Sequence, residues 1–275
     1  MTHRSPDELL TAYQRDGFVF LPSLIPQALL HRLQAELPAV LNEEGPQRFF
    51  EQDGTTVRAV YGLHRKSGPW REASEASVLL RIASLLLGHA PYVFQWKINP
   101  KSTGTGEHWQ WHRDFTFWQH ADGMPAPDVL TAAVFLDDIT QDNGPLRLIP
   151  GSHRVTTPHE QQQPAPRDLA SHNGNDYAGL VSARLSYALP AETAEELSCT
   201  HGEFMATGGA GSVAFFHGNL VHGSAPNTSP HPRTLGLITY NTVRNAPPDH
   251  AGSRPEYFYR HRPDPLAETR PYGTP

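Results

Sequence analysis

The 275-residue sequence has little of what several classes of protein require. Its one cysteine, Cys199, excludes an internal disulfide, which favours a reducing compartment such as the cytoplasm. Its formal net charge of -6 at pH 7 argues against nucleic-acid binding, which needs a basic face. Its longest apolar runs, such as 82–87, are too short to span a bilayer, and we expect no secretion signal because the first residues lack an apolar core. These shortages predict a cytoplasmic protein that binds neither membrane nor nucleic acid, and they leave open whether it is a monomer or a homodimer.

Glycine and proline, by contrast, are abundant, with 22 and 26 residues, and they break the chain into short elements. Helices are expected in the first part of the chain, over 7–16, 26–41 and 75–87, with strands over 18–21 and 55–63. Further along, short strands alternate with turn signals, at 92–98, 129–136, 146–149, 211–216 and 234–243. Many short strands with flanking helices predict a mainly β fold, either a sandwich or a barrel.

The length fits a single domain over residues 1–275. We expect a helical N-terminal part over about 5–90, a β core over about 91–245 and a proline-rich tail over about 246–275 that wraps the surface. The polar stretch 156–186 is too long for an ordinary connector, so it is expected to be a lid or an insertion.

Two histidines and one aspartate form the most informative pattern in the chain. His112 and Asp114 lie in an aromatic run, and His222 precedes a Gly-Ser pair. Two imidazoles and a carboxylate occupy one face of a metal and leave other positions open, which suits non-haem Fe(II) that binds a cosubstrate and dioxygen together. Arg233, further along the chain, suits a dicarboxylic cosubstrate because its planar guanidinium pairs bidentately with a carboxylate. The set predicts an iron(II)- and 2-oxoglutarate-dependent dioxygenase.

A His-x-Asp pair also occurs by chance, and the chain contains a second one, His120 and Asp122. Asp122 leads into Gly-Met-Pro, a turn signal, so its carboxylate is expected to cap a turn. His112 and Asp114 would share one face of an alternating strand, as two ligands of one metal must. We therefore assign the metal to the first pair.

Four stretches of the chain follow one another in an order that is typical of a known family. They are Gln95-Trp96-Lys97-Ile98-Asn99, the metal segment 111–118 with Asp122-Gly123-Met124-Pro125, the turn and strand 143–153, and the closing segment 211–233. With these motifs the chain resembles the phytanoyl-CoA dioxygenase family of iron(II)/2-oxoglutarate enzymes, and most closely its bacterial ectoine hydroxylase branch, over roughly residues 7 to 245. The resemblance implies a double-stranded β-helix, a cupin-like jelly roll with flanking helices.

The resemblance also implies a role for each matching residue. The iron ligands are His112, Asp114 and His222, and no further catalytic side chain is implied. The residues beside 2-oxoglutarate are Gln95, Asn99, Ser224 and Arg233, the last two at its distal carboxylate. The residues on the substrate side are Lys97, Trp118 and Phe216, to which the spacing along the expected strands adds Thr131, Leu237 and Thr239.

The match departs from the branch at positions that are expected to face the substrate. Thr116 and Phe117 stand where the branch has an acidic residue and a threonine, and Leu237 and Thr239 stand where it has aromatic and apolar residues. The smaller wall predicts a compact zwitterionic amino acid rather than ectoine, with its carboxylate paired to Lys97.

Three functions remain open at this point. The leading one is hydroxylation of an unactivated C–H bond of a free amino acid or amino-acid derivative, with iron(II), 2-oxoglutarate and dioxygen. Asp114 favours hydroxylation because halogenases of this type usually lack the carboxylate, which frees a place for chloride; desaturation and cyclisation stay open. The alternative is a tailoring oxygenase acting on a larger natural-product intermediate. The third is a jelly-roll binding protein without catalysis, against which the intact triad and Arg233 argue.

Overall fold

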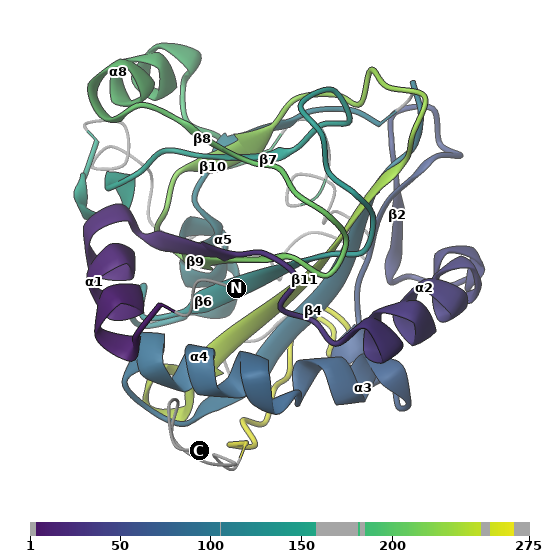
Figure 1. Cartoon of the computed structure of the whole chain (residues 1–275), viewed down its shortest axis with the longest axis horizontal. Coiled ribbons are helices and arrows are strands. Elements are labelled where there is room, and N and C mark those ends of the chain that lie inside the picture. Colours follow the sequence, from purple (N-terminus) through teal and green to yellow (C-terminus); the bar gives the residue numbers. More distant parts are fainter. Residues whose placement is uncertain (1–3, 105, 158–180, 182–184, 249–253, 267–275) are drawn as a thin grey trace.

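The strands of the chain form two antiparallel sheets (Figure 1). The structure is a computed structural model and describes residues 4–104, 106–157, 181, 185–248 and 254–266. The larger sheet runs in the order β1 (Phe18–Leu21), β9 (Val213–His217), β6 (Leu130–Phe135), β11 (Arg233–Thr242), β4 (Pro91–Lys101), β3 (Val57–Val60) and β2 (Arg48–Phe50). The smaller sheet runs in the order β5 (Trp109–His112), β10 (His222–Ser224), β7 (Leu146–Leu148) and β8 (Phe204–Ala206).

The two sheets share an apolar layer between them. Phe135, Phe216 and Leu235 of the larger sheet pack in one cluster with Leu146 and Leu148 of the smaller sheet. Strands far apart in the sequence pair directly, as β1 does with β9 and β5 with β10. This arrangement confirms the predicted fold, a mainly β jelly roll with flanking helices.

Helices cover the other face of the larger sheet: α1 (Pro6–Asp16), α2 (Gln27–Asn42), α3 (Pro69–Ser74) and α4 (Ser77–Leu87) (Figure 1). The start of α1 is fixed by a capping box, in which Ser5 Oγ accepts from the Glu8 amide at 3.2 Å and the Glu8 carboxylate accepts from the Ser5 amide at 2.6 Å. The apolar stripe of α4 buries Leu79 and Ile82 against sheet residues such as Ile238. The helices thus keep one face of the sheet dry and leave the other face to the site.

The helices expected over 7–16, 26–41 and 75–87 are present, and each expected strand overlaps an observed one. The short β2 and β8, and the helices α3, α5 (Asp114–Asp122) and α8 (Ala191–His201), were not predicted. Three-residue strands carry too little alternation to be recognised in a sequence. The expected lid or insertion over 156–186 lies outside the described residues except for 156–157, 181 and 185–186. Across the described ranges, the helices are all too short or too polar to cross a bilayer.

Residues 254–266 of the tail lie mostly at the surface, as expected, but three of them are buried anchors. Phe258 and Tyr259 are buried in a third apolar cluster with Phe94 and Trp118. Arg254 Nε donates to Asp122 Oδ1 at 2.7 Å in an ion pair that is buried on both sides. The composition of the tail does not reveal these buried contacts, because they join residues far apart in the sequence. Arg254 pairs with Asp122, which lies 132 positions earlier.

Candidate metal centre and its cavity

Three side chains of ligand type converge beside the smaller sheet. His112 ends β5, Asp114 begins α5, and His222 begins β10. Nε2 of His112 lies 3.7 Å from Asp114 Oδ1, and Nε2 of His222 lies 3.7 Å from Asp114 Oδ2. All three side chains are buried, and one ligand atom from each lies within 4.8 Å of the others. In the part of the chain that the structure describes, no other group of three or more His, Cys, Asp or Glu side chains could hold a metal in this way.

Backbone carbonyls fix the orientation of both imidazoles. Nδ1 of His112 lies 2.6 Å from the Gln110 carbonyl oxygen, and Nδ1 of His222 lies 2.9 Å from the Leu220 carbonyl oxygen. A carbonyl only accepts hydrogen bonds, so each Nδ1 carries the proton and each Nε2 keeps its lone pair. Both lone pairs are therefore available on the side of Asp114, as metal coordination requires.

The expectation that His112 and Asp114 share a strand is wrong, although the two side chains do meet. The strand ends at His112, and the Phe115 amide donates to the Gly218 carbonyl at 2.9 Å, so the chain leaves the sheet at Asp114. The start of α5 favours an ionised carboxylate at Asp114, because a helix dipole is positive at its N-terminus. The aromatic residues of 115–118 hid this helix from the sequence reading because aromatic side chains favour strands.

The protonation states suit metal binding. Burial opposes ionisation of Asp114, but the Lys97 ammonium and the two imidazoles outweigh it and hold its pKa well below the usual range. Burial and the neighbouring His112 lower the pKa of His222 to about 3, so its imidazole is neutral at pH 7. A neutral imidazole and an ionised carboxylate are the forms that bind a metal. The donor set, two nitrogens and one carboxylate, fits iron(II).

An open cavity lies against the three side chains. Of the ten further site residues that the sequence singled out, six line it: Lys97, Asn99, Phe216, Ser224, Arg233 and Leu237. The side-chain oxygen of Asn99 is buried there without a hydrogen-bond partner among the described residues. Such an atom fits a site that is completed by a polar ligand.

Arg233 supplies the buried positive charge of this cavity. It is 2% exposed, and its guanidinium donates to the Gly144 carbonyl, with Nε at 2.8 Å, and to the Asn99 carbonyl at 3.5 Å. Burial lowers its pKa to about 9, against the opposing effect of Asp137, so it stays protonated at neutral pH. Among the described residues no carboxylate lies within 4.0 Å of it. A buried cation of this kind fits a carboxylate of a ligand.

Four of the predicted site residues do not line this cavity. Gln95, Thr131 and Thr239 form a row across β4, β11 and β6, with the two threonine hydroxyls 3.3 Å apart. Gln95 Nε2 donates to the Phe258 carbonyl at 2.7 Å. Trp118 packs edge-on against Phe94 in the third apolar cluster.

The second His-x-Asp pair stays away from the metal centre, as predicted, but not for the predicted reason. Asp122 caps no turn; it is fully buried and pairs with Arg254. His120 stacks on Tyr187, with ring centroids 4.7 Å apart. The turn signal after Asp122 is genuine, since Gly123 ends α5 with a φ of 73°.

The sequence did not indicate four residues that line the cavity, Trp109, Leu146, Gly223 and Leu235. Leu235 lies between Arg233 and Leu237 at the alternating spacing of β11, so the pattern that selected its neighbours also contained it. Trp109 pairs in register with Ser224, which only the strand pairing reveals. Leu146 belongs to a three-residue strand with no motif of its own.

Comparison with known proteins places these features in a family. The profile described as phytanoyl-CoA dioxygenase (PhyH) matches residues 13–235. The L-proline trans-4-hydroxylase of Streptomyces griseoviridis is 37% identical over 235 residues, which cover 86% of each chain. The ectoine dioxygenase of Halomonas elongata is 34% identical over 261 residues, which cover 93% of this chain and 76% of that protein.

Solved structures agree with the sequence relatives. EctD from S. alaskensis with 2-oxoglutarate and 5-hydroxyectoine has a TM-score of 0.79 at 27% identity, over 98% of this chain and 90% of that one. The same protein with bound Fe has a TM-score of 0.77 at 28% identity, over 97% and 88%. The enzyme therefore uses iron(II), 2-oxoglutarate and dioxygen. The chain belongs to the phytanoyl-CoA dioxygenase family.

Proposed function

We propose that the enzyme hydroxylates a compact zwitterionic amino acid, with His112, Asp114 and His222 as its iron ligands. The bound iron, with 2-oxoglutarate and dioxygen, supplies the oxidant that removes hydrogen from a C–H bond. The two imidazoles and the carboxylate hold the metal on one face and leave the other face for the cosubstrate and dioxygen.

In this proposal Arg233 and Ser224 bind the distal carboxylate of 2-oxoglutarate. Ser224 follows His222 by two residues in β10, and both line the cavity with Arg233. The buried guanidinium, which lacks a carboxylate partner among the described residues, supports this role. The amide of Asn99, with its unpartnered oxygen, lies beside the same ligand.

The observation that carries the substrate class is Lys97. It lines the cavity at 8% exposure, and its charge acts directly on the Asp114 carboxylate. A carboxylate of the substrate paired with Lys97 would place the rest of a small molecule next to the metal. Phe216 and Leu237 form the apolar wall there, and this wall fits an aliphatic side chain or ring. The similarity to an L-proline hydroxylase supports the same class.

Gln95, Trp118, Thr131 and Thr239 lie outside the lining of the cavity; Gln95 contacts Phe258 of the tail, and Trp118 shares an apolar cluster with it. We assign them to the outer substrate wall, with Gln95 nearest to the cosubstrate. We also propose a cytoplasmic enzyme, monomeric or homodimeric, that binds no nucleic acid; the single exposed Cys199 and the net charge of -6 support this.

Substrate-dependent succinate formation tests the proposal. Purified enzyme with Fe(II) and 2-oxoglutarate is offered L-proline, other cyclic amino acids, linear amino acids and ectoine, and the products are identified by mass spectrometry. We expect a free amino acid to gain one oxygen atom and to react faster than ectoine. Ectoine as the best substrate would contradict this, as would turnover of bulky apolar natural products alone, the result for a tailoring oxygenase.

A variant of Lys97 separates the substrate from the cosubstrate. Lys97→Met removes the ammonium and keeps most of the length of the side chain. It should raise the KM for the amino acid by about 10- to 100-fold, because a charge-assisted hydrogen bond is lost, and leave the KM for 2-oxoglutarate within about threefold of the native value. Equal effects on both constants would assign Lys97 to the cosubstrate instead.

A further inference from the structure

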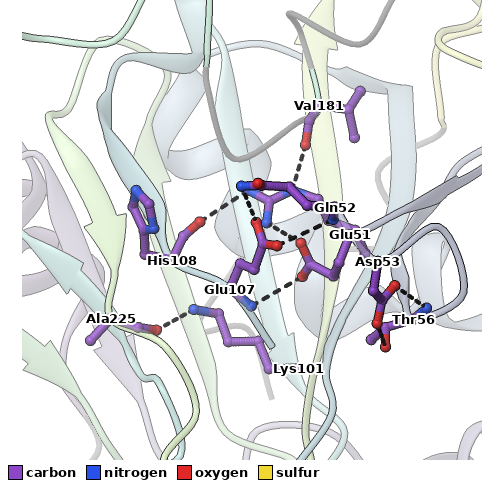
Figure 2. Close-up of polar contacts among 10 residues, drawn as sticks. Glu51, Gln52, Asp53, Thr56, Lys101, Glu107, His108, Val181 and Ala225 are labelled. Carbon is purple, nitrogen blue, oxygen red and sulfur yellow. Dashed lines mark hydrogen bonds and ion pairs between the residues drawn. The ribbon is translucent and has the colours of Figure 1, made fainter. Parts of the chain in front are cut away.

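A buried ion pair lies next to the cavity and has no part in the chemistry described above. Arg58 of β3 and Glu51, which follows β2, are 0% and 6% exposed, and Arg58 Nη1 donates to Glu51 at 2.7 Å. Figure 2 shows the cluster around this pair. Burying two charges is costly, and an apolar pair of similar volume often stabilises a fold as well. The pair therefore calls for an explanation beyond stability.

Both members of the pair hydrogen-bond to residues 107 and 108, which lead into β5. Arg58 Nη2 donates to the His108 carbonyl at 3.1 Å, and Glu51 accepts from the Glu107 amide at 3.2 Å. Arg58 Nε donates to the Val181 carbonyl at 2.5 Å, so each of the three guanidinium nitrogens donates to a described residue, which fixes the plane of the group. A guanidinium held in this way is a rigid surface.

Trp109 lies on that surface. The guanidinium carbon of Arg58 is 3.9 Å from the centroid of the indole ring, which is close enough for a cation–π contact. The ring also lines the cavity, and Trp109 pairs in register with Ser224. Its centroid lies 6.4 Å from that of the His112 imidazole. The indole thus stands between Arg58 and the end of the cavity where Ser224 and Arg233 lie.

We infer that Arg58 is a positioning residue that holds the Trp109 indole as a wall of the 2-oxoglutarate end of the cavity. The inference rests on the proposed role of Ser224 and Arg233. Without the fixed cation behind it, the indole loses a partner and adopts other rotamers, which loosens the packing around the cosubstrate. Arg58 touches neither the metal ligands nor Lys97 in any described contact, so its effect should fall on the cosubstrate.

The test is a double-mutant cycle of Arg58→Lys and Trp109→Leu. Lysine keeps the charge but has neither the plane nor the five donors. We expect each single variant to weaken 2-oxoglutarate binding to the Fe(II)-loaded protein by about tenfold, measured by calorimetry without oxygen. The double variant should be no weaker than the worse single variant, because both remove one interaction. Unchanged affinity in Arg58→Lys, or effects that multiply in the double variant, would overturn the inference.

Two further proteins keep the test decisive. Arg254→Lys is the matched control, since Arg254 is also buried, paired with a carboxylate and 4.7 Å from the ring centroid of Phe258, but that ring, unlike Trp109, does not line the cavity. This variant should lower stability and leave 2-oxoglutarate affinity unchanged.

If Arg58→Lys does not fold, Glu51→Leu with Arg58→Met replaces the pair by apolar residues. This protein should also bind 2-oxoglutarate about tenfold more weakly, and native affinity would overturn the inference. The calorimetry needs no amino-acid substrate, so its outcome is independent of the substrate screen.

Discussion

His112 and His222 are direct partners across β5 and β10, and their ring centroids lie 4.2 Å apart. In each ring Nδ1 hydrogen-bonds to the backbone carbonyl oxygen two residues earlier, so the same local arrangement occurs twice. The distance between the two Nε2 atoms is therefore set by the spacing of neighbouring strands, and only Asp114 reaches the site from a helix.

This geometry predicts that none of the three ligands can be spared. His112→Ala, Asp114→Ala and His222→Ala should each lower Fe(II) affinity and turnover. Removing a residue that only hydrogen-bonds to a metal ligand typically costs roughly 10- to 100-fold, and removing a ligand itself should cost more. His120→Ala is the control, because His120 stacks on Tyr187 outside the group. Metal titration and succinate formation measure both effects, and full activity in Asp114→Ala would refute the assignment.

Arg233 predicts a selective defect in cosubstrate binding. Arg233→Ala should raise the KM for 2-oxoglutarate by on the order of 10- to 1,000-fold, since a buried carboxylate loses its charged partner. Arg233→Lys should recover only part of the affinity because an ammonium cannot form the planar fork. Steady-state kinetics over a range of 2-oxoglutarate concentrations decides this, and an unchanged KM in the alanine variant would assign the role to another cation.

Lys101 predicts a stability that rises with pH. It is 1% exposed and donates to the Ala225 carbonyl. Burial, Arg233 and Arg58 lower its pKa to about 6, against the attraction of Glu51. Between that value and its unfolded pKa of 10.5, the unfolded chain binds one proton more, so the free energy of unfolding increases with pH by at most about 1.4 kcal/mol per unit. Below about pH 6 both states are protonated, and the penalty is complete and constant.

The measurement is urea unfolding at about pH 7 and about pH 8.5, a window above the lowered histidine pKa values and below that of Arg233. Lys101→Met should remove most of the slope and be more stable than the native protein at pH 7, because the native fold holds Lys101 mostly deprotonated there, at a cost that methionine does not have. An identical slope in the variant would show that Lys101 stays charged in the fold.

The pair of Asp122 and Arg254 predicts a large loss of stability when one partner alone is removed. Asp122→Ala should lower the free energy of unfolding by about 3–5 kcal/mol, since it leaves a buried guanidinium without its partner. Asp122→Leu with Arg254→Met should lose much less, because no charge remains. Denaturant unfolding of the two proteins measures the difference, and equal losses would mean that packing rather than charge dominates.

The iron site could be predicted from the sequence because its ligands belong to short motifs with a definite chemistry. His112, Asp114, His222 and Arg233 carry the signal in their residue types, and the structure brings them to one cavity. The pattern could not reveal that Asp114 opens a helix, since aromatic residues after it favour a strand.

The contacts that hold residues around the cavity could not be predicted in the same way. Gln95 meets the Phe258 carbonyl, and Arg58 meets Trp109, through pairings that join distant parts of the chain. Such pairings leave no periodic pattern in the sequence, because each partner is set by the register of the sheets rather than by its neighbours. The buried anchors of the tail could not be predicted for the same reason, since a proline-rich segment can still supply aromatic anchors.

The burial of Arg254, Phe258 and Tyr259 has a consequence for how the enzyme is made. A ribosome releases this segment after the strands that carry the iron ligands, and domains begin to fold from the N-terminal side during synthesis. Until Arg254 and Phe258 arrive, Asp122 has no cation and the aromatic cluster around Phe94 has an open side. During synthesis the three metal ligands therefore appear before the residues that close the aromatic cluster. A chain that ends near residue 250 contains all three ligands but lacks Arg254, Phe258 and Tyr259.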